Sequence, residues 1–102
     1  MIILVKVMQI DDILEISNKG FALVGGNTKI DIENSVQIKD LVGKEVIVKS
    51  FDDEELNFKV TDVSISFSIG GHLLIGIYIG YPTNISKVKK GSTIYSKNIK
   101  LA

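Results

Sequence analysis

Residues of like character recur at every second position over much of this chain. In the stretch 73–79, one row consists only of Leu and Ile, and the other contains Gly76 and Tyr78. A period of two is typical of a β-strand with one face against a core. Ile occurs 17 times and Val 10 times, whereas Ala and Met occur twice each. Because β-branched residues fit a pleated surface and helices favour Ala, Leu and Met, the sequence predicts a nearly all-β protein.

Turn-forming residues divide the alternating stretches into short strands. The cluster Ser17–Gly20 lies between two apolar stretches and predicts a hairpin, and Gly70–His72 predicts a further turn. In the stretch 30–38 the apolar residues occupy even positions, and the polar pair Asn34-Ser35 interrupts this pattern. The stretch is therefore either one interrupted strand or two short strands. Strands are expected over 1–10, 14–16, 21–24, 30–38, 45–49, 56–69, 73–79, 93–96 and 98–101, with a single turn anchored by Ile85 and Val88.

The longest alternating stretch, 56–69, changes parity partway along. Phe58 occupies an even position, whereas Val63 and the apolar residues after it occupy odd positions. An extra residue near Thr61–Asp62 must absorb this change, as a β-bulge or a bend of the type that turns barrel corners. Short strands with evenly spaced glycine turns indicate a sandwich or a small barrel, and the bend favours the barrel. We therefore predict that residues 1–102 form one all-β domain, a small closed or partly closed antiparallel β-barrel.

Glycine-containing motifs follow one another in a recognisable order. Gly70–Gly80 combines a glycine turn, a strand with an internal glycine and a closing glycine, and Ile85–Ile94 adds a lysine-glycine turn before a strand. This order resembles the second domain of elongation factor Tu and related translational GTPases. Ile16–Gly25 is similar to an earlier hairpin of that family, although Lys19 stands where the family usually has Arg and Asn18 replaces a glycine. The resemblance covers nearly the whole chain and implies a translation-protein barrel as a stand-alone domain.

Residue types that carry catalysis or bind metals are scarce. His72 is the only His, and the chain has neither Cys nor Arg. A zinc site or a catalytic triad would need further partners, so His72 is interpreted as a turn residue. The acidic run Asp52–Glu55 lacks the glycine and the spaced ligands of a calcium loop and is interpreted as a solvated hairpin tip. Since a phosphate-binding G-x-x-x-x-G-K-[ST] loop is also missing, we expect no enzyme, no GTP hydrolysis, no metal and no cofactor.

The charges are divided unevenly along the chain. Residues 1–62 hold all twelve acids and seven Lys, and residues 63–102 hold five Lys and no acid, so the net charges are −5 and +5. Lysines interleaved with tyrosines can bind phosphates and stack on bases. The alternative is that barrel closure brings the two halves together and averages the charge. The candidate contact residues for RNA or another partner are Lys19, Tyr78, Tyr81, Lys87, Lys89, Lys90, Tyr95 and Lys97.

Tyr78 differs from the other candidates in its neighbours along the expected strand. It belongs to the outer row and lies between Gly76 and Gly80, so no bulky neighbour on its own strand shares its face. The two glycines predict a groove in which a base or a partner strand could lie against the ring. The alternative is that the ring packs across the sheet over a glycine.

Two functions are compatible with these features. The first is a non-catalytic module that contacts tRNA or ribosomal RNA, as the resemblance implies, with weak and non-specific binding because Arg is absent. The second is a protein-interaction module, either an assembly subunit or a small antagonist, that uses the strand edges left unpaired in a partly closed barrel. No apolar stretch approaches the roughly 18 residues that a membrane span needs, so we expect a cytoplasmic monomer or weak homo-oligomer.

Overall fold

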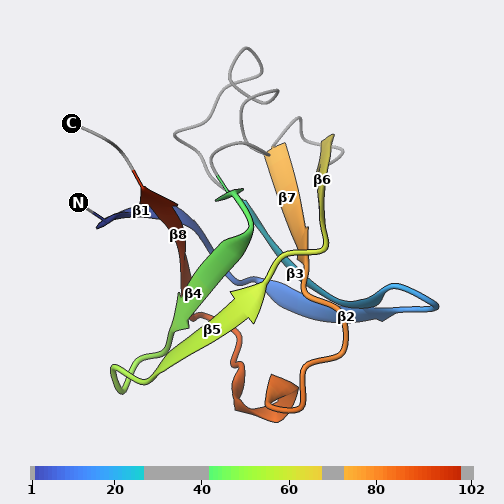
Figure 1. The fold of residues 1–102 in the computed structure, drawn as a ribbon. Helices are drawn as coiled ribbons and strands as arrows, with labels where there is room; N and C mark the ends of the chain where they lie inside the picture. Colours follow the sequence, from blue (N-terminus) through green and yellow to red (C-terminus); the bar gives the residue numbers. More distant parts are fainter. Residues whose placement is uncertain (1, 27–41, 68–72, 100–102) are drawn as a thin grey trace.

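The computed structural model describes residues 2–26, 42–67 and 73–99, and its strands form two antiparallel sheets (Figure 1). The first sheet has the strand order β1-β8-β4-β5, and the second has the order β2-β3-β7-β6. The described elements are β1 (Ile2–Gln9), β2 (Asp12–Ile16), β3 (Gly20–Gly26), β4 (Glu45–Lys49), β5 (Glu55–Lys59), β6 (Asp62–Phe67), β7 (Leu73–Tyr78), the 3₁₀ turn η2 (Ile85–Lys87) and β8 (Thr93–Ile99). The all-β prediction is confirmed, whereas the expected strand at 30–38 and the expected turn at Gly70–His72 lie outside the described residues.

The hairpin predicted around Ser17–Gly20 is present as β2 and β3. Its register pairs Ile16 with Gly20, and the turn places Asn18 at φ 67° and Gly20 at φ 92°. Asn and Gly tolerate such positive φ values better than other residues, which explains why this sequence turns here. At the C-terminal end the prediction needs correction, because one continuous strand, β8, replaces the two expected short strands.

The predicted change of parity near Thr61–Asp62 marks the point where the chain leaves one sheet for the other. The structure has two strands, β5 and β6, in place of one long strand with a bulge. The Val60 N–H donates to the Lys44 carbonyl at 2.8 Å in the first sheet, and the Thr61 N–H donates to the Tyr78 carbonyl at 2.8 Å in the second. The bend is therefore confirmed, and it passes the chain between sheets without leaving either of these two N–H groups unpaired.

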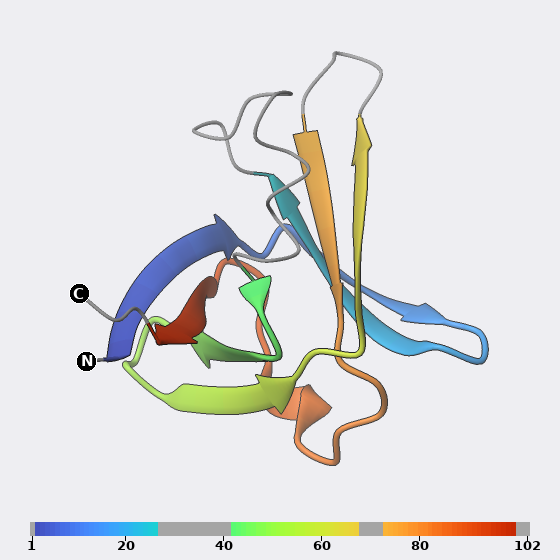
Figure 2. The ribbon, with the colours of Figure 1, turned by 45° about the horizontal axis from the view of Figure 1, so that its top comes forward.

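A second corner of the same kind joins β1 to β2 (Figure 2). The Ile10 N–H donates to the Ser92 carbonyl, and the Asp11 N–H donates to the Val24 carbonyl, each at 2.8 Å. The sequence predicts one regular strand over 1–10, but the β1–β8 register shifts between Lys6 and Met8. The shift is a bulge, and it explains why the adjacent side chains of Val7 and Met8 are both buried.

The core lies between the sheets and is almost entirely aliphatic. The predicted inner row of β7 is confirmed, because Leu73, Ile75, Ile77 and the following Ile79 are all buried. The predicted anchors of η2 also contribute, with Val88 buried and Ile85 half-buried against the core. The remaining buried core residues are Val7, Met8, Ile10, Leu23, Val42, Val46, Val48, Phe58, Val63 and Ile94.

Candidate functional site

Two of the eight predicted contact residues, Lys19 and Tyr78, contact each other, and a third, Tyr81, contacts Phe21 at the same end of the second sheet. Lys19 belongs to the β2–β3 turn, Tyr78 ends β7, and Tyr81 follows it in the loop toward η2. The Lys19 Nζ lies 5.7 Å from the centroid of the Tyr78 ring, within the range of a cation–π interaction. The Tyr81 ring meets Phe21 edge to face, with 6.1 Å between centroids and 75° between planes. We call Lys19, Phe21, Tyr78 and Tyr81 the Tyr–Lys cluster.

Two glycines hold this cluster together by bringing the β2–β3 hairpin against the end of β7. A Cβ on Gly20 would lie 2.3 Å from the carbonyl oxygen of Gly80, so only glycine fits at this contact. The Phe21 N–H donates to the Gly80 carbonyl at 2.8 Å, and the Ile79 N–H donates to the Phe21 carbonyl at 3.0 Å. Phe21 was not predicted as a member of the cluster, because no local pattern indicates a contact between residues sixty positions apart.

The groove predicted beside Tyr78 is filled on the side of Gly76. Gly76 is buried, and the Ser64 Oγ lies 2.6 Å from the place that a Gly76 Cβ would take. The Tyr78 ring leans toward the same glycine, with its Cε1 atom 3.8 Å from that place. The half-buried ring therefore covers Gly76 and lies under Lys19, so the expectation of an open groove at this glycine is wrong.

We expect Tyr78→Ala to reduce the free energy of unfolding by about 1 to 3 kcal/mol, less than the 3 to 5 kcal/mol of a fully buried aromatic residue. Tyr78→Phe keeps the ring over Gly76 and is expected to remain within about 0.5 kcal/mol of the wild type. Urea denaturation of the three proteins measures both effects. If Tyr78→Ala has the same free energy of unfolding as the wild type, the Tyr78 ring does not stabilise the sheet by packing over Gly76.

Tyr81 is the exposed ring of the cluster, with 62% of its surface accessible. Its contact with Phe21 orients the ring, since edge-to-face pairs contribute roughly 0.5 to 1.5 kcal/mol beyond the burial of their area. Phe21 is itself half-buried and packs against the core. Tyr81 is therefore an accessible aromatic side chain on a supported base, as a binding contact requires.

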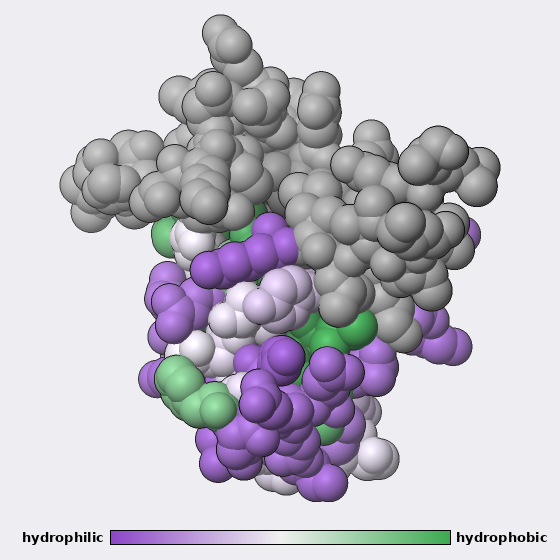
Figure 3. Space-filling model, turned by 90° about the vertical axis from the view of Figure 1, so that its left-hand side faces the viewer, coloured by the Kyte–Doolittle hydropathy of each residue, from purple (hydrophilic) through white to green (hydrophobic). Residues whose placement is uncertain are grey.

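Tyr95 and Lys97 lie in a different part of the molecule. Both belong to β8 in the interior of the first sheet, where Tyr95 is opposite Lys6 and Ile47, and Lys97 is opposite Leu4. Tyr95 is half-buried and lies on the outer face, because its neighbours in the strand, Ile94 and Ser96, are buried. Figure 3 views the side of the molecule on which the first sheet lies, and its coloured atoms are mainly hydrophilic. The structure therefore does not bring these two candidates to the Tyr–Lys cluster.

The lysines after η2 lie next to acids from the first half of the chain. Lys90 Nζ is 3.3 Å from Asp12 Oδ1. The pKa of Asp12 is lowered mainly by the hydrogen bond from the Ile13 N–H and further by Lys90. Lys87 and Lys89 are exposed, and Lys89 makes a small contribution to the lowered pKa of Asp52. The alternative in which the fold averages the charges is thus supported for two of the three lysines.

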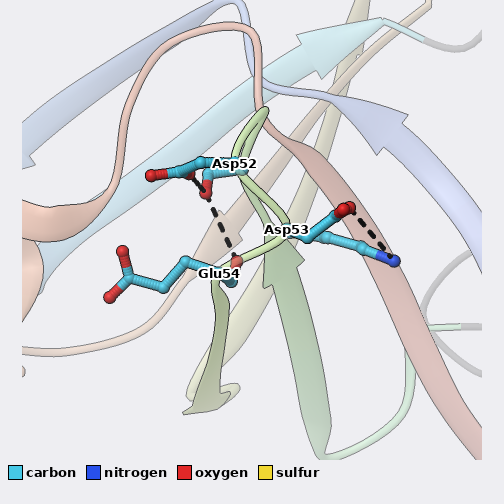
Figure 4. Close-up of polar contacts among 5 residues, drawn as sticks. Asp52, Asp53 and Glu54 are labelled. Atoms are coloured by element: carbon cyan, nitrogen blue, oxygen red, sulfur yellow. Dashed lines mark hydrogen bonds and ion pairs between the residues drawn. The ribbon is translucent and has the colours of Figure 1, made fainter.

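Asp52 belongs to the predicted acidic hairpin tip, which the structure confirms as the turn between β4 and β5 (Figure 4). The Ser50 hydroxyl donates to Asp52, and this hydrogen bond is the largest cause of the lowered Asp52 pKa, ahead of the weaker attraction to Lys89. Asp53 points to the other side of the turn, where its Oδ1 lies 3.7 Å from Lys49 Nζ. Exposed contacts of this kind stabilise little, so the turn is a solvated tip as predicted.

Two further observations concern the kind of protein. Among the residues that the structure describes, no group of three His, Asp or Glu side chains is arranged to hold a metal ion, and His72 is outside that part. The same part of the chain contains no helix of the length and apolarity needed to span a membrane.

The chain matches no protein-family model, no curated protein and no solved structure. The likeness to elongation factor Tu therefore stays a prediction from the sequence.

Proposed function

We propose that this protein is a non-catalytic module that binds a protein partner through the Tyr–Lys cluster. The observation that carries the proposal is the 62% exposed ring of Tyr81, held on Phe21 at a point where two strands are joined by glycine contacts. Tyrosine is among the residues that contribute most to protein interfaces, because it adds a large apolar area at low entropic cost. A preorganised ring lowers that cost further.

The distribution of charge favours a protein over RNA as the partner. RNA affinity depends on how many phosphates a protein neutralises. Lys90 is paired with Asp12, and Lys89 makes a small contribution to the lowered pKa of Asp52. These acids offset the positive charge of the C-terminal part, so the local field is weaker than the lysine count suggests.

RNA binding is a second candidate function, supported by one feature of the same cluster. Lys19 brings a positive charge next to the ring of Tyr78, and the exposed ring of Tyr81 follows three residues later in the chain. A cation beside an exposed ring can contact a phosphate while a base stacks, and such stacking contributes about 1 to 3 kcal/mol per base. Tyr81 is better placed for this role than Tyr78, whose ring already lies under Lys19.

The experiment compares the full chain with Tyr81→Ala, using Phe51→Ala as the matched control. Phe51 is an aromatic residue that is 80% exposed, but it belongs to the β4–β5 turn. The immobilised proteins are incubated with nuclease-treated extract of the source cells, and the affinity of the retained partner is then measured. We expect Tyr81→Ala to weaken binding about tenfold or more and Phe51→Ala to leave it unchanged.

Three results would contradict a protein partner that is bound through the Tyr–Lys cluster. Equal retention by both variants would remove Tyr81 from the interface, and loss of every partner after nuclease treatment would favour nucleic acid. In the third case, tRNA would bind the purified chain at low salt, lose affinity steeply as salt rises, and depend on Lys19 and Tyr81.

The barrel predicted from the sequence is proposed as the scaffold of this module. The two corners support it, because Ile10 and Asp11, and likewise Val60 and Thr61, bond neighbours in different sheets. Adjacent residues of a strand direct their peptide groups to opposite sides, so each corner continues one bent strand with a different neighbour on either side. Counting β1 with β2 and β5 with β6 as single bent strands would join the eight described strands into a ring of six at the two corners, while β6 beyond its corner still pairs only with β7. Such a ring is compatible with the translation-protein barrel that the resemblance implies.

A further inference from the structure

One edge strand of the second sheet lacks the features that usually protect a sheet edge. Within the described part of the chain, β6 pairs only with β7, and Figures 1 and 2 both show it at the outer side of β7. Exposed edges are commonly protected by charges, proline, bulges or covering segments, because an unpaired edge can bind another strand. After Asp62, β6 reads Val-Ser-Ile-Ser-Phe and contains neither charge nor proline.

The other edge strands differ from β6 in this respect. β1 has a bulge and the exposed Lys6, and β5 begins and ends with the exposed residues Glu55 and Lys59. β2 contains Glu15, which is exposed, and Asp12, which pairs with Lys90. Among the described edge strands, β6 is thus the one whose only charge lies at its first residue, Asp62, whose carboxylate accepts a hydrogen bond from the Val63 N–H at 2.8 Å.

The side chains of β6 are compatible with pairing at this edge. Val63 is buried and Ile65 is half-buried, so both belong to the core side of the sheet. Ser64 and Ser66 are exposed on the outer face. Small uncharged residues on that face allow another strand to approach without burying an unpaired charge.

We propose that β6 pairs with β6 of a second copy of the chain, antiparallel and centred on Ile65. This register places Ser64 of one copy opposite Ser66 of the other, and Val63 opposite Phe67. The order Val-Ser-Ile-Ser-Phe is nearly symmetric about Ile65, so this register pairs serine positions with serine positions and apolar positions with apolar positions. The two Asp62 residues lie at opposite ends of the pair, and no like charges meet. A twofold pair of this kind extends the second sheet into one eight-stranded sheet across the dimer.

The dimer is independent of the proposed binding function. Its contacts are backbone hydrogen bonds along β6, whereas partner binding rests on Tyr81. A single pair of edge strands is a small interface, and small interfaces give weak, concentration-dependent association. The protein should therefore exchange between monomer and dimer rather than form a permanent dimer.

Sedimentation equilibrium tests the proposal with pairs of charges introduced on β6. The wild-type chain is expected to rise toward twice the monomer mass as its concentration increases. S64K/S66K puts lysine opposite lysine at two positions and is expected to remain monomeric, and so is S64E/S66E, which puts glutamate opposite glutamate. Asn57→Lys is the matched control, because Asn57 is exposed on the edge strand β5, and it should dimerise like the wild type.

Mixing the two charged variants distinguishes an edge contact from a folding defect. In an equimolar mixture each lysine faces a glutamate, so the dimer mass is expected to return, while either variant alone stays monomeric and retains the wild-type circular dichroism spectrum. A wild-type chain that is monomeric at every concentration would overturn the proposal. Dimers that persist in S64K/S66K, or a mixture that fails to dimerise, would also overturn it. Loss of partner binding in Tyr81→Ala would not affect this result.

Discussion

Gly25→Ala is expected to destabilise the protein by at least about 2 kcal/mol, whereas Gly26→Ala, one residue further on, should leave its stability unchanged or slightly raised. A Cβ on Gly25 would lie 2.1 Å from the carbonyl oxygen of Gln9 and 3.2 Å from its carbon. These are backbone atoms of β1, so a shift of β3 against β1 is needed, and even ordinary overpacking costs about 1 to 3 kcal/mol.

The adjacent glycine is a matched control for this substitution. A Cβ on Gly26 would have the Leu73 carbonyl oxygen as its nearest neighbour, at 3.4 Å. Without a clash, replacing glycine with alanine restricts the unfolded chain and raises stability by roughly 0.4 to 1 kcal/mol. Urea denaturation measures both variants, and equal effects would contradict the close approach of β3 to β1 at this corner.

Leu23→Ala is expected to reduce the free energy of unfolding by about 3 to 5 kcal/mol. Leu23 is fully buried on β3, and removing its side chain leaves a cavity that the surrounding strands cannot fill completely. For a chain of this size such a loss lowers Tm by more than roughly 10 °C.

Leu14 provides the comparison, because it is a leucine on the other strand of the same hairpin and is 43% exposed. Leu14→Ala is expected to cost less than about 1 kcal/mol, since little area is lost and no closed cavity forms. Thermal melts of the two variants measure the difference. A similar loss in both would mean that the hairpin does not bury one leucine and expose the other.

The features that were predictable from the sequence depend only on residues that are close together in the chain. The inner row of β7 follows from alternation alone, because a strand turns Ile75 and Ile77 to the same face whatever the other strands do. The corner after β5 was predictable for the same reason, since the change of parity between Phe58 and Val63 requires an extra residue wherever the chain goes.

The features that were not predictable depend on pairs of residues far apart in the chain. The bulge in β1 leaves no mark on its alternation, and only the register with β8 reveals that Val7 and Met8 are both buried. The sequence predicts a bulge or bend between β5 and β6, but no local feature indicates that these two strands belong to different sheets.

The candidate site divides in the same way. Lys19 and Tyr78 were predicted as individual contacts, but their juxtaposition follows from the contact of Gly20 with Gly80. Lys90 belongs to the positively charged part of the chain and Asp12 to the negatively charged part. Because the two residues form an ion pair, the two parts of the chain do not form separate charged surfaces at this point. The surface potential can be inferred from the charges of a sequence only when the topology shows which charges lie close together.

The pairing of β1 with β8 has a consequence for the order in which this chain can fold during synthesis. β1 leaves the ribosome first, but its hydrogen-bonding neighbour in the first sheet, β8, extends to Ile99. The hairpins β2–β3 and β4–β5 can form from local contacts, whereas the first sheet cannot close until the last strand has emerged. During that interval the apolar strand β1 is exposed to chaperones and to neighbouring nascent chains, and a chain cut short before Thr93 would retain that exposure permanently.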